Sequence, residues 1–196
     1  MFNRPIVIAA LTAVSLFSSS ALACAWSVEQ RTARLSFASV KNDHIAELHR
    51  FTEITGAWAG SNVMIRIPVS SLDTLIPIRN ERMAEHLFKA AEHPVIEANA
   101  TIRPEQIAAL KVGDSLVLDV AITVQLAGQR GQVPAKVQIT KVSDKRLLAT
   151  TVQPIMMDSK AFGLTEGIET LREIAGLASI DFVVPVTFSV TFTQPG

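Results

Sequence analysis

The four histidines are the side chains best suited to acid-base or metal chemistry. They stand at His44, His49, His86 and His93. None forms a His-Glu-x-x-His pair, and Glu85-His86 matches only the end of an inverted zinc motif, because Arg82 stands where that motif needs its first histidine. We therefore interpret the histidines as surface or helix-packing residues and expect no metal site.

Other catalytic motifs are missing from the sequence as well. It contains no Gly-x-Ser-x-Gly nucleophile elbow, no phosphate-binding glycine loop and no Cys-x-x-Cys pair. The carboxylate pairs Asp43/Glu47 and Glu81/Glu85 have the four-residue spacing typical of a solvated face. These observations favour a binding protein over an enzyme, and they indicate no cofactor.

The charge balance excludes another class of partner. Lys+Arg 18 equals Asp+Glu 18, only 18% of residues are charged, and 48% are hydrophobic. Capture of nucleic acid needs a concentrated positive surface, which a neutral chain without a basic cluster lacks. The composition predicts a folded protein that binds no nucleic acid.

The first 23 residues have the organisation of a secretory signal peptide. Arg4 precedes an apolar run from Ile6 to Phe17, and Ala21-Leu22-Ala23 fits a small-x-small cleavage site. We expect cleavage after residue 23, a mature domain over residues 24–196 and a periplasmic location. The alternative is a lipoprotein acylated at Cys24, although such signals usually carry Leu where Ala21 stands. Cys24 is the sole cysteine, so no intramolecular disulfide is available.

Two-residue alternation of apolar and polar side chains dominates the mature chain. It is clearest over Ser115–Leu126 and Phe182–Phe192. Further strands are expected at Arg34–Val40, Leu48–Ala57, Asn62–Val69, Ile96–Ile102, Val133–Ile139 and Leu147–Met157, with a hairpin turn at Ala127–Gly131. Helical spacing is confined to Ile78–Ala91, Pro104–Leu110 and Thr165–Leu177. About eight strands with short helical inserts predict an all-β fold, an antiparallel β-barrel; a two-sheet sandwich is the alternative.

Short motifs in the middle of the chain resemble one known family. They are Ser71-Leu72-Asp73-Thr74, Arg79-Asn80-Glu81, His86-Leu87 and His93-Pro94-Val95-Ile96. Trp26 with Leu35-Ser36-Phe37, Gly56-Ala57-Trp58-Ala59-Gly60 and Asp158-Ser159-Lys160-Ala161-Phe162-Gly163 extend the match over the mature chain. In order and type these motifs resemble the YceI-like polyisoprenoid-binding family, whose opening strand pair, glycine-containing hairpin and Asp-x-Phe-Gly stretch they match. His93 stands where the family usually has Tyr.

The resemblance implies a lipocalin-like barrel whose apolar tunnel holds an isoprenoid quinone or polyprenyl chain. The ligand-binding residues expected from it and from the alternation are Phe37, Ile65, Ile67, Leu118, Val120, Ile122, Val137, Ile139, Val186, Phe188 and Val190, with Phe162, Leu164, Ile168 and Leu171 closing one end. Each is equally explicable as ordinary core, so a filled barrel remains an alternative.

Three functions follow from these possibilities. The first is an exported protein that sequesters or carries an isoprenoid lipid, with transient membrane contact. The second is an enzyme, or a partner of a redox protein, acting on such a lipid. The third is a ligand-free structural or stress-response barrel, and a homodimer is left open.

Overall fold

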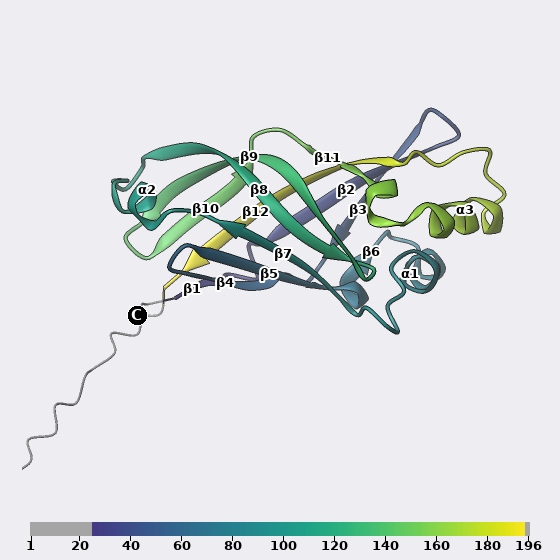
Figure 1. The fold of residues 1–196 in the computed structure, drawn as a ribbon, viewed down its shortest axis with the longest axis horizontal. Coiled ribbons are helices and arrows are strands. Elements are labelled where there is room, and N and C mark those ends of the chain that lie inside the picture. Colours follow the sequence, from purple (N-terminus) through teal and green to yellow (C-terminus); the bar gives the residue numbers. More distant parts are fainter. Residues whose placement is uncertain (1–24, 195–196) are drawn as a thin grey trace, which may run out of the picture.

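Twelve antiparallel strands form a single sheet in the computed structural model, which describes residues 25–194 (Figure 1). The strands are β1 (Trp26–Val28), β2 (Arg34–Lys41), β3 (Ile45–Phe51), β4 (Thr55–Ala59), β5 (Asn62–Pro68), β6 (Leu72–Asp73), β7 (Val95–Thr101), β8 (Ser115–Leu126), β9 (Gln129–Ser143), β10 (Arg146–Thr151), β11 (Ile155–Asp158) and β12 (Val183–Thr193).

Pairing between β1 and β12 closes this sheet into an eight-stranded barrel. The ring runs β1-β4-β5-β7-β8-β9-β10-β12, and Val28 lies opposite Phe192 where it closes. The remaining strands β2, β3, β6 and β11 lengthen the barrel wall at one end. Each of them lies in line with one strand of the ring and is separated from it by a short break; β2, for example, pairs with β12 beyond the point where β1 does. The expected antiparallel barrel is confirmed, and the sandwich alternative is wrong.

The breaks correct two expected strands. Leu48–Ala57 divides into β3 and β4, and Leu147–Met157 divides into β10 and β11. Pro154, which has no N–H to donate, stands in the second break. In the first break the Ile54 side chain is 1% exposed and packs in the core, while the N–H of Thr52 donates to the carbonyl of Ser71.

The start of the barrel also differs from the strand pair that the resemblance implied. Trp26 lies in β1 and pairs with Trp58 of β4, whereas Leu35 and Phe37 lie in β2 and pair with β12 and β3. β1 and β2 are therefore successive parts of one barrel position, not partners of each other.

The β8–β9 hairpin matches the predicted turn and shows why it forms. Leu126 pairs with Gln129, which leaves Ala127 and Gly128 as a two-residue loop. Their φ angles of 48° and 81° are both positive, as the tight turns that fit the right-handed strand twist require. A glycine at the second position adopts this conformation without steric cost.

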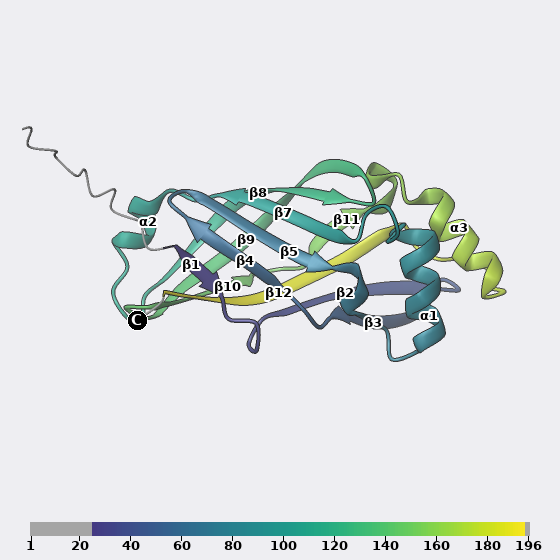
Figure 2. The same ribbon diagram turned by 90° about the horizontal axis from the view of Figure 1, so that it is seen from below.

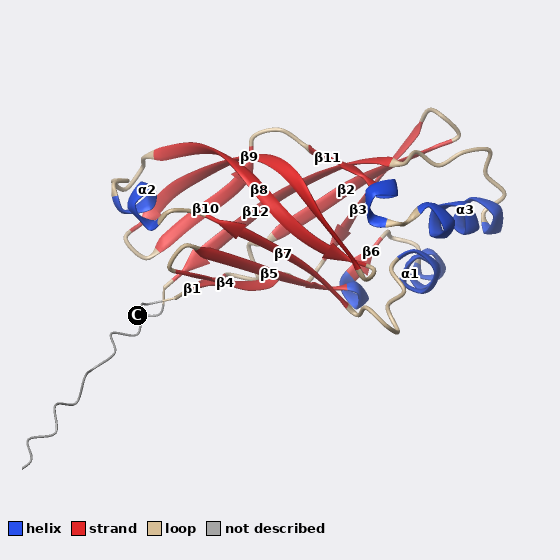
Figure 3. Cartoon of the chain, viewed as in Figure 1, coloured by secondary structure: helices blue, strands red, loops and turns tan. Residues whose placement is uncertain are grey.

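Helices lie at the two ends of the barrel, as the blue segments in Figure 3 show. At one end is α2 (Pro104–Ala108); at the other are α1 (Pro77–Arg82), a short π-helix η2 (Met83–Leu87) and α3 (Thr165–Ile174) (Figure 2). Two 3₁₀ turns, η1 (Val69–Ser71) and η3 (Ser159–Phe162), complete the elements. All three helices are shorter than predicted from Ile78–Ala91, Pro104–Leu110 and Thr165–Leu177.

Residues with positive φ explain two of the early helix ends. Lys89 follows η2 at φ 51°, and Gly176 follows α3 at φ 62°. Neither conformation continues a right-handed helix. Among the described residues, no helix has the length and apolar character needed to cross a membrane.

Gly167 lets α3 lie directly on η2. A Cβ placed there would come within 2.5 Å of the carbonyl oxygen of His86 and 3.0 Å of the Cα of Leu87. Both are backbone atoms, so any side chain at this position would push the two elements apart. The close approach packs α3 against η2 at this end of the barrel, where Ile168 of α3 and Leu87 of η2 are both buried.

Candidate functional site

The interior of the barrel contains an apolar cavity of about 230 Å³. Its volume exceeds the ~150 Å³ of an engineered apolar cavity that stays dry and binds benzene. The lining residues are Leu35, Phe37, Phe51, Ile54, Trp58, Val63, Ile65, Ile67, Leu87, Phe88, Ile96, Ala98, Asn99, Ala100, Ile102, Val120, Ile122, Val124, Leu126, Val133, Val137, Ala149, Ile155, Met157, Ser159, Leu164, Ile168, Val184, Val186, Phe188, Val190 and Phe192.

The cavity is long and narrow. Every second residue of β12 lines it from Val184 to Phe192. At the usual rise of a strand, those eight steps span about 27 Å. A volume of about 230 Å³ spread over that length suits one slender chain better than a rounded ligand.

The lining offers almost no polar partner. Its only residues with hydrogen-bonding side-chain groups other than the Trp58 indole are Asn99 and Ser159. The Ser159 hydroxyl already donates to the carbonyl of Phe182 at 2.7 Å, and the Trp58 indole N–H donates to the carbonyl of Gly60. Asn99 alternates along β7 with Ala98 and Ala100, which face the interior. The cavity is therefore suited to a hydrocarbon and holds no charged group for a head group.

Packed aromatic and aliphatic side chains line the cavity at both ends. At the α2 end, the rings of Trp58 and Phe192 meet edge to face with centroids 5.6 Å apart. At the other end, Phe88 meets Phe51 at 6.0 Å, and Leu164 and Ile168 pack in the core. The lining is therefore apolar at both ends as well as along the walls.

Eleven of the fifteen residues expected to bind ligand line this cavity. They are Phe37, Ile65, Ile67, Val120, Ile122, Val137, Leu164, Ile168, Val186, Phe188 and Val190. They come from strands far apart in the sequence, and barrel closure brings them together. Their contact with a ligand is part of the proposal below.

The other four expected residues pack in or against the core without lining the cavity. Leu118 and Ile139 lie on the inward faces of β8 and β9, and Ile139 is fully buried. Phe162 lies against Gly131 of β9, where a Cβ would stand 2.9 Å from its ring, so it closes the wall from the side. Leu171, one turn beyond Ile168 on α3, packs against the core from the helical end.

Sequence reasoning missed many of the lining residues. Alternation could have found Val124, Leu126 and Phe192, which share a strand face with selected residues of β8 and β12, and also Ile96, Ala98 and Ala100, which form one face of the expected strand Ile96–Ile102. Ile54 lies in a strand break and Phe88 lies just beyond η2, where no periodicity marks the inward side. Leu87 and Ile155 likewise required the closed barrel to be placed.

A polar cluster lies next to the cavity between β2, β3 and α1. Glu47 accepts from Arg79 at 2.8 Å and lies 3.0 Å from the Lys41 ammonium. His49 is 3% exposed; its Nε2 shares a hydrogen bond with Ser39 Oγ at 2.8 Å, and its ring lies 5.1 Å from that of Phe37. Nδ1 of His49 is buried with no hydrogen-bond partner among the described residues.

The electrostatics of this cluster oppose a charge on His49. Burial lowers its pKa, the positive charges of Arg79 and Lys41 lower it further, and Glu47 opposes them. Burial acts to raise the pKa of Glu47, but hydrogen bonds with Arg79 and Lys41 outweigh burial and hold that pKa below its usual value. His49 is therefore a neutral, packed side chain at neutral pH. Within residues 25–194 no group of three or more His, Cys, Asp or Glu side chains is placed to hold a metal ion.

We expect the free energy of unfolding to decrease as the pH falls below about 6.5, the usual pKa of histidine. His49 has a lower pKa in the folded chain, so below that pH the unfolded chain takes up the proton first and unfolding becomes easier. Urea unfolding at pH 7.5 and 5.5 measures the loss. The loss of unfolding free energy between the two pH values should be smaller in His49→Phe, because phenylalanine does not titrate. In the control variant His44→Gln, which changes an exposed turn residue, the loss should be the same as in the wild type. An equal loss in His49→Phe would contradict the assignment.

Comparison with known proteins places this barrel in a family. A family model described as the YceI-like domain matches residues 26–192. A polyisoprenoid binding domain from Saccharophagus degradans, implicated in plant cell wall breakdown, is similar with 30% sequence identity and a TM-score of 0.85; the match covers 89% of this chain and 99% of that one. BcnA from Burkholderia cenocepacia shares the fold at 15% identity and a TM-score of 0.61, over 84% of this chain and 98% of its own. No curated protein matches the chain. With its closed barrel and a family match that spans nearly all of the described residues, the chain belongs to the YceI-like domain family.

Proposed function

We propose that this protein is an exported carrier that holds one isoprenoid lipid, an isoprenoid quinone or a polyprenyl chain, inside its barrel. The observation that carries the proposal is the long apolar cavity, whose lining offers no charged side chain. The similar domain from Saccharophagus degradans, described as polyisoprenoid binding, supports the choice of lipid.

The energetics favour such a ligand. Burying a methylene group contributes about 0.8 kcal/mol, and micromolar affinity needs about 8 kcal/mol. Roughly ten buried methylene equivalents, or two isoprene units, therefore reach that level before the cost of ordering the chain. Because apolar contacts have no direction, selectivity should follow the length and width of the cavity rather than individual side chains.

The cavity supports binding rather than catalysis. Ser159 uses its hydroxyl for a backbone carbonyl, and His49 packs beside Phe37 with its ring nitrogens buried or bonded. A catalytic group must reach the reacting atoms. Neither residue presents a reactive atom to a ligand in the cavity.

Export to the periplasm is part of the proposal and rests on the sequence of residues 1–23. That leader and Cys24 lie outside the described residues. Intact mass of protein from its own host distinguishes a chain beginning at residue 24 from one that carries lipid on the cysteine.

Native mass spectrometry of protein from its own host tests the carrier function. We expect a mass increment of one lipid per chain, which organic extraction removes and identifies. The stripped protein should then take up one equivalent of either a prenyl quinone or a polyprenol, because the cavity contacts only the shared hydrocarbon. A straight saturated chain of equal length serves as the comparison ligand.

Two results would overturn the proposal. Repeated preparations without lipid, together with no uptake from a mixture of prenyl quinone and polyprenol, would leave a barrel without a carried ligand. Uptake of the saturated chain with equal or higher affinity would show a general lipid carrier and not one selective for isoprenoids.

A further inference from the structure

The two most exposed large apolar side chains of the described residues lie near one end of the barrel. Leu75 is 78% exposed and Leu48 is 70% exposed. Leu75 begins a run of four consecutive exposed apolar residues that continues through Ile76, Pro77 and Ile78. Single exposed apolar residues are ordinary, but a contiguous set of this kind marks an interaction site. We call Leu48 and residues 75–78 the apolar tip.

Register brings the two parts of the tip together. β3 pairs with β6 so that Arg50 lies opposite Asp73 and Phe51 opposite Leu72. β6 ends at Asp73, whose carboxylate accepts from Arg50 of β3 and also from the N–H of Leu75, so the turn that carries Leu75 is bonded to β3 through Asp73. Leu48 shares the outward face of β3 with Arg50, while Phe51 on the inward face lines the cavity.

The backbone holds Leu75 in an unusual conformation. Its φ is 63°, in the left-handed region that leucine rarely adopts. The N–H of Leu75 donates to Asp73 Oδ1 at 2.9 Å, and Arg50 in turn donates twice to Asp73 Oδ2. A turn that needed only this geometry would be served better by Asn or Gly.

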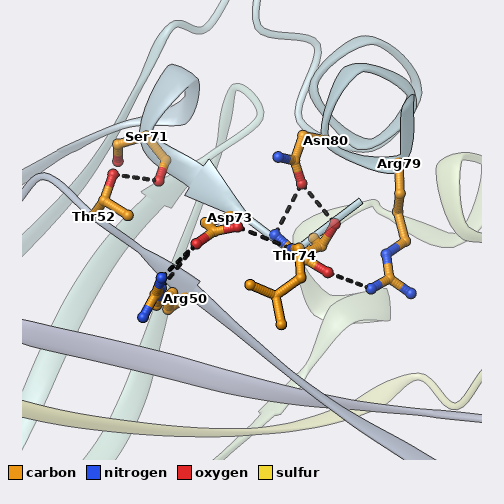
Figure 4. A network of polar contacts seen from close by, with 8 residues as sticks. Arg50, Thr52, Ser71, Asp73, Thr74, Arg79 and Asn80 are labelled. Atoms are coloured by element: carbon orange, nitrogen blue, oxygen red, sulfur yellow. Dashed lines mark hydrogen bonds and ion pairs between the residues drawn. The ribbon is translucent and has the colours of Figure 1, made fainter. Parts of the chain in front are cut away.

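A network of hydrogen bonds holds Thr74, the residue that precedes Leu75 in the chain, and Figure 4 shows its bonds with Asn80 and Arg79. Asn80 Oδ1 accepts from the N–H of Thr74 at 2.9 Å and from its hydroxyl at 2.6 Å. Arg79, from the same helix α1, donates to the carbonyl of Thr74 at 2.6 Å. Thr74 is 1% exposed, so a buried polar anchor lies directly beside the most exposed leucine. The backbone that carries the tip is therefore held in place by hydrogen bonds.

We infer that the apolar tip inserts into the surface of a lipid bilayer and so places the end of the cavity at the membrane; this rests on the proposed lipid-carrying function. The tip lies close to this end of the cavity: Leu72, three residues before Leu75, lies opposite Phe51, and Phe51 lines the cavity with its ring packed against that of Phe88. A lipid leaving a membrane would meet this end first.

The size and charge of the tip favour a bilayer over a protein partner. Five projecting residues are few beside the ~20–30 residues a side of a standard protein interface. Two neighbouring arginines are already paired, Arg50 with Asp73 and Arg79 with Glu47. Insertion should therefore be apolar in character and should not require anionic lipid, unlike binding by a basic patch.

Vesicle flotation with the mature protein tests this surface. Leu48→Thr suits an exposed strand position, and Leu75→Asn suits a left-handed one, so the double variant should keep the fold. We expect it to lose at least tenfold in partitioning to phosphatidylcholine vesicles. The matched control is the double variant Val112→Thr/Val142→Thr, which removes two exposed valines at the α2 end of the barrel. The two valines lie on neighbouring segments, because the N–H of Gly113 donates to the carbonyl of Lys141.

The controls separate this inference from the carrier function. Both double variants should take up prenyl lipid dispersed from solvent as the wild type does, while only Leu48→Thr/Leu75→Asn should extract it slowly from vesicles. If the wild type floats with vesicles but takes up no lipid, the carrier function is contradicted while the membrane-binding role of the tip is supported. The membrane assignment would be overturned if the wild type did not bind vesicles, or if the tip variant floated equally well. It would also be overturned if the wild type were a dimer and the tip variant a monomer, because the tip would then be a dimer interface.

Discussion

Replacing Ala98 by Phe should strongly weaken lipid binding and yet stabilise the empty barrel. Ala98 lies on β7 between Ile65 of β5 and Val124 of β8, and all three residues line the cavity. A phenyl ring there points into a space of about 230 Å³. Because a cavity of ~150 Å³ is filled by benzene, one added ring occupies most of the room that a ligand needs.

The two effects of this substitution have opposite signs for one reason. The ring competes with the lipid for the same apolar surface, so we expect lipid affinity to fall at least a hundredfold, a loss of about 2.7 kcal/mol. The same contacts fill a void, which typically adds about 1 kcal/mol to stability. If the barrel were already filled with side chains, Ala98→Phe would instead destabilise the protein, because overpacking a core costs about 1–3 kcal/mol.

Lipid titration and urea unfolding of the stripped protein measure both quantities. Ala121→Phe is the matched control, since Ala121 is exposed on the outer face of β8 and faces no cavity. It should bind lipid as wild type does. Unchanged affinity in Ala98→Phe would show that the lipid lies elsewhere, and a loss of stability would show that the barrel is already packed.

The strand alternation was sufficient to predict the barrel, because successive side chains of a strand point to opposite faces and the apolar ones therefore mark the inward face. β8 begins and ends at Ser115 and Leu126 as predicted, and β12 differs from its prediction by one residue at each end. The strand breaks were not predictable in the same way. Phe51 and Ile54 both line the cavity, although residues three apart lie on opposite faces of a regular strand, and the bend that allows this is bonded to distant Ser71 through the N–H of Thr52.

The site was harder to predict than the fold because inward-facing does not mean cavity-lining. Val137 and Ile139 are neighbours on the same face of β9, and the sequence treats them alike. In the closed barrel Val137 lines the cavity, whereas Ile139, between Leu116 and Ala149, is completely enclosed. What separates them is which side chains arrive from other strands, information that no local pattern carries.

This distinction yields the second prediction, which concerns the free energy of unfolding. Ile139→Ala should destabilise the protein by about 3–4 kcal/mol, because a fully enclosed side chain leaves a new void when it is truncated. Ile65→Ala makes the same chemical change at a half-buried residue that borders an existing cavity. Since Ile65 has packing partners on fewer sides, its loss should cost only about 1–2 kcal/mol.

Lipid affinity should show the opposite order. Ile65→Ala removes surface that the ligand touches, and we expect about a tenfold weaker complex. Ile139→Ala, measured where the variant remains folded, should stay within about threefold of wild type. Urea unfolding of the stripped proteins and lipid titration at low temperature give the four values. If Ile139→Ala weakens binding as much as Ile65→Ala does, the ligand extends past Val137 toward α2, and the boundary of the cavity lies farther along β9 than the packing of Ile139 indicates.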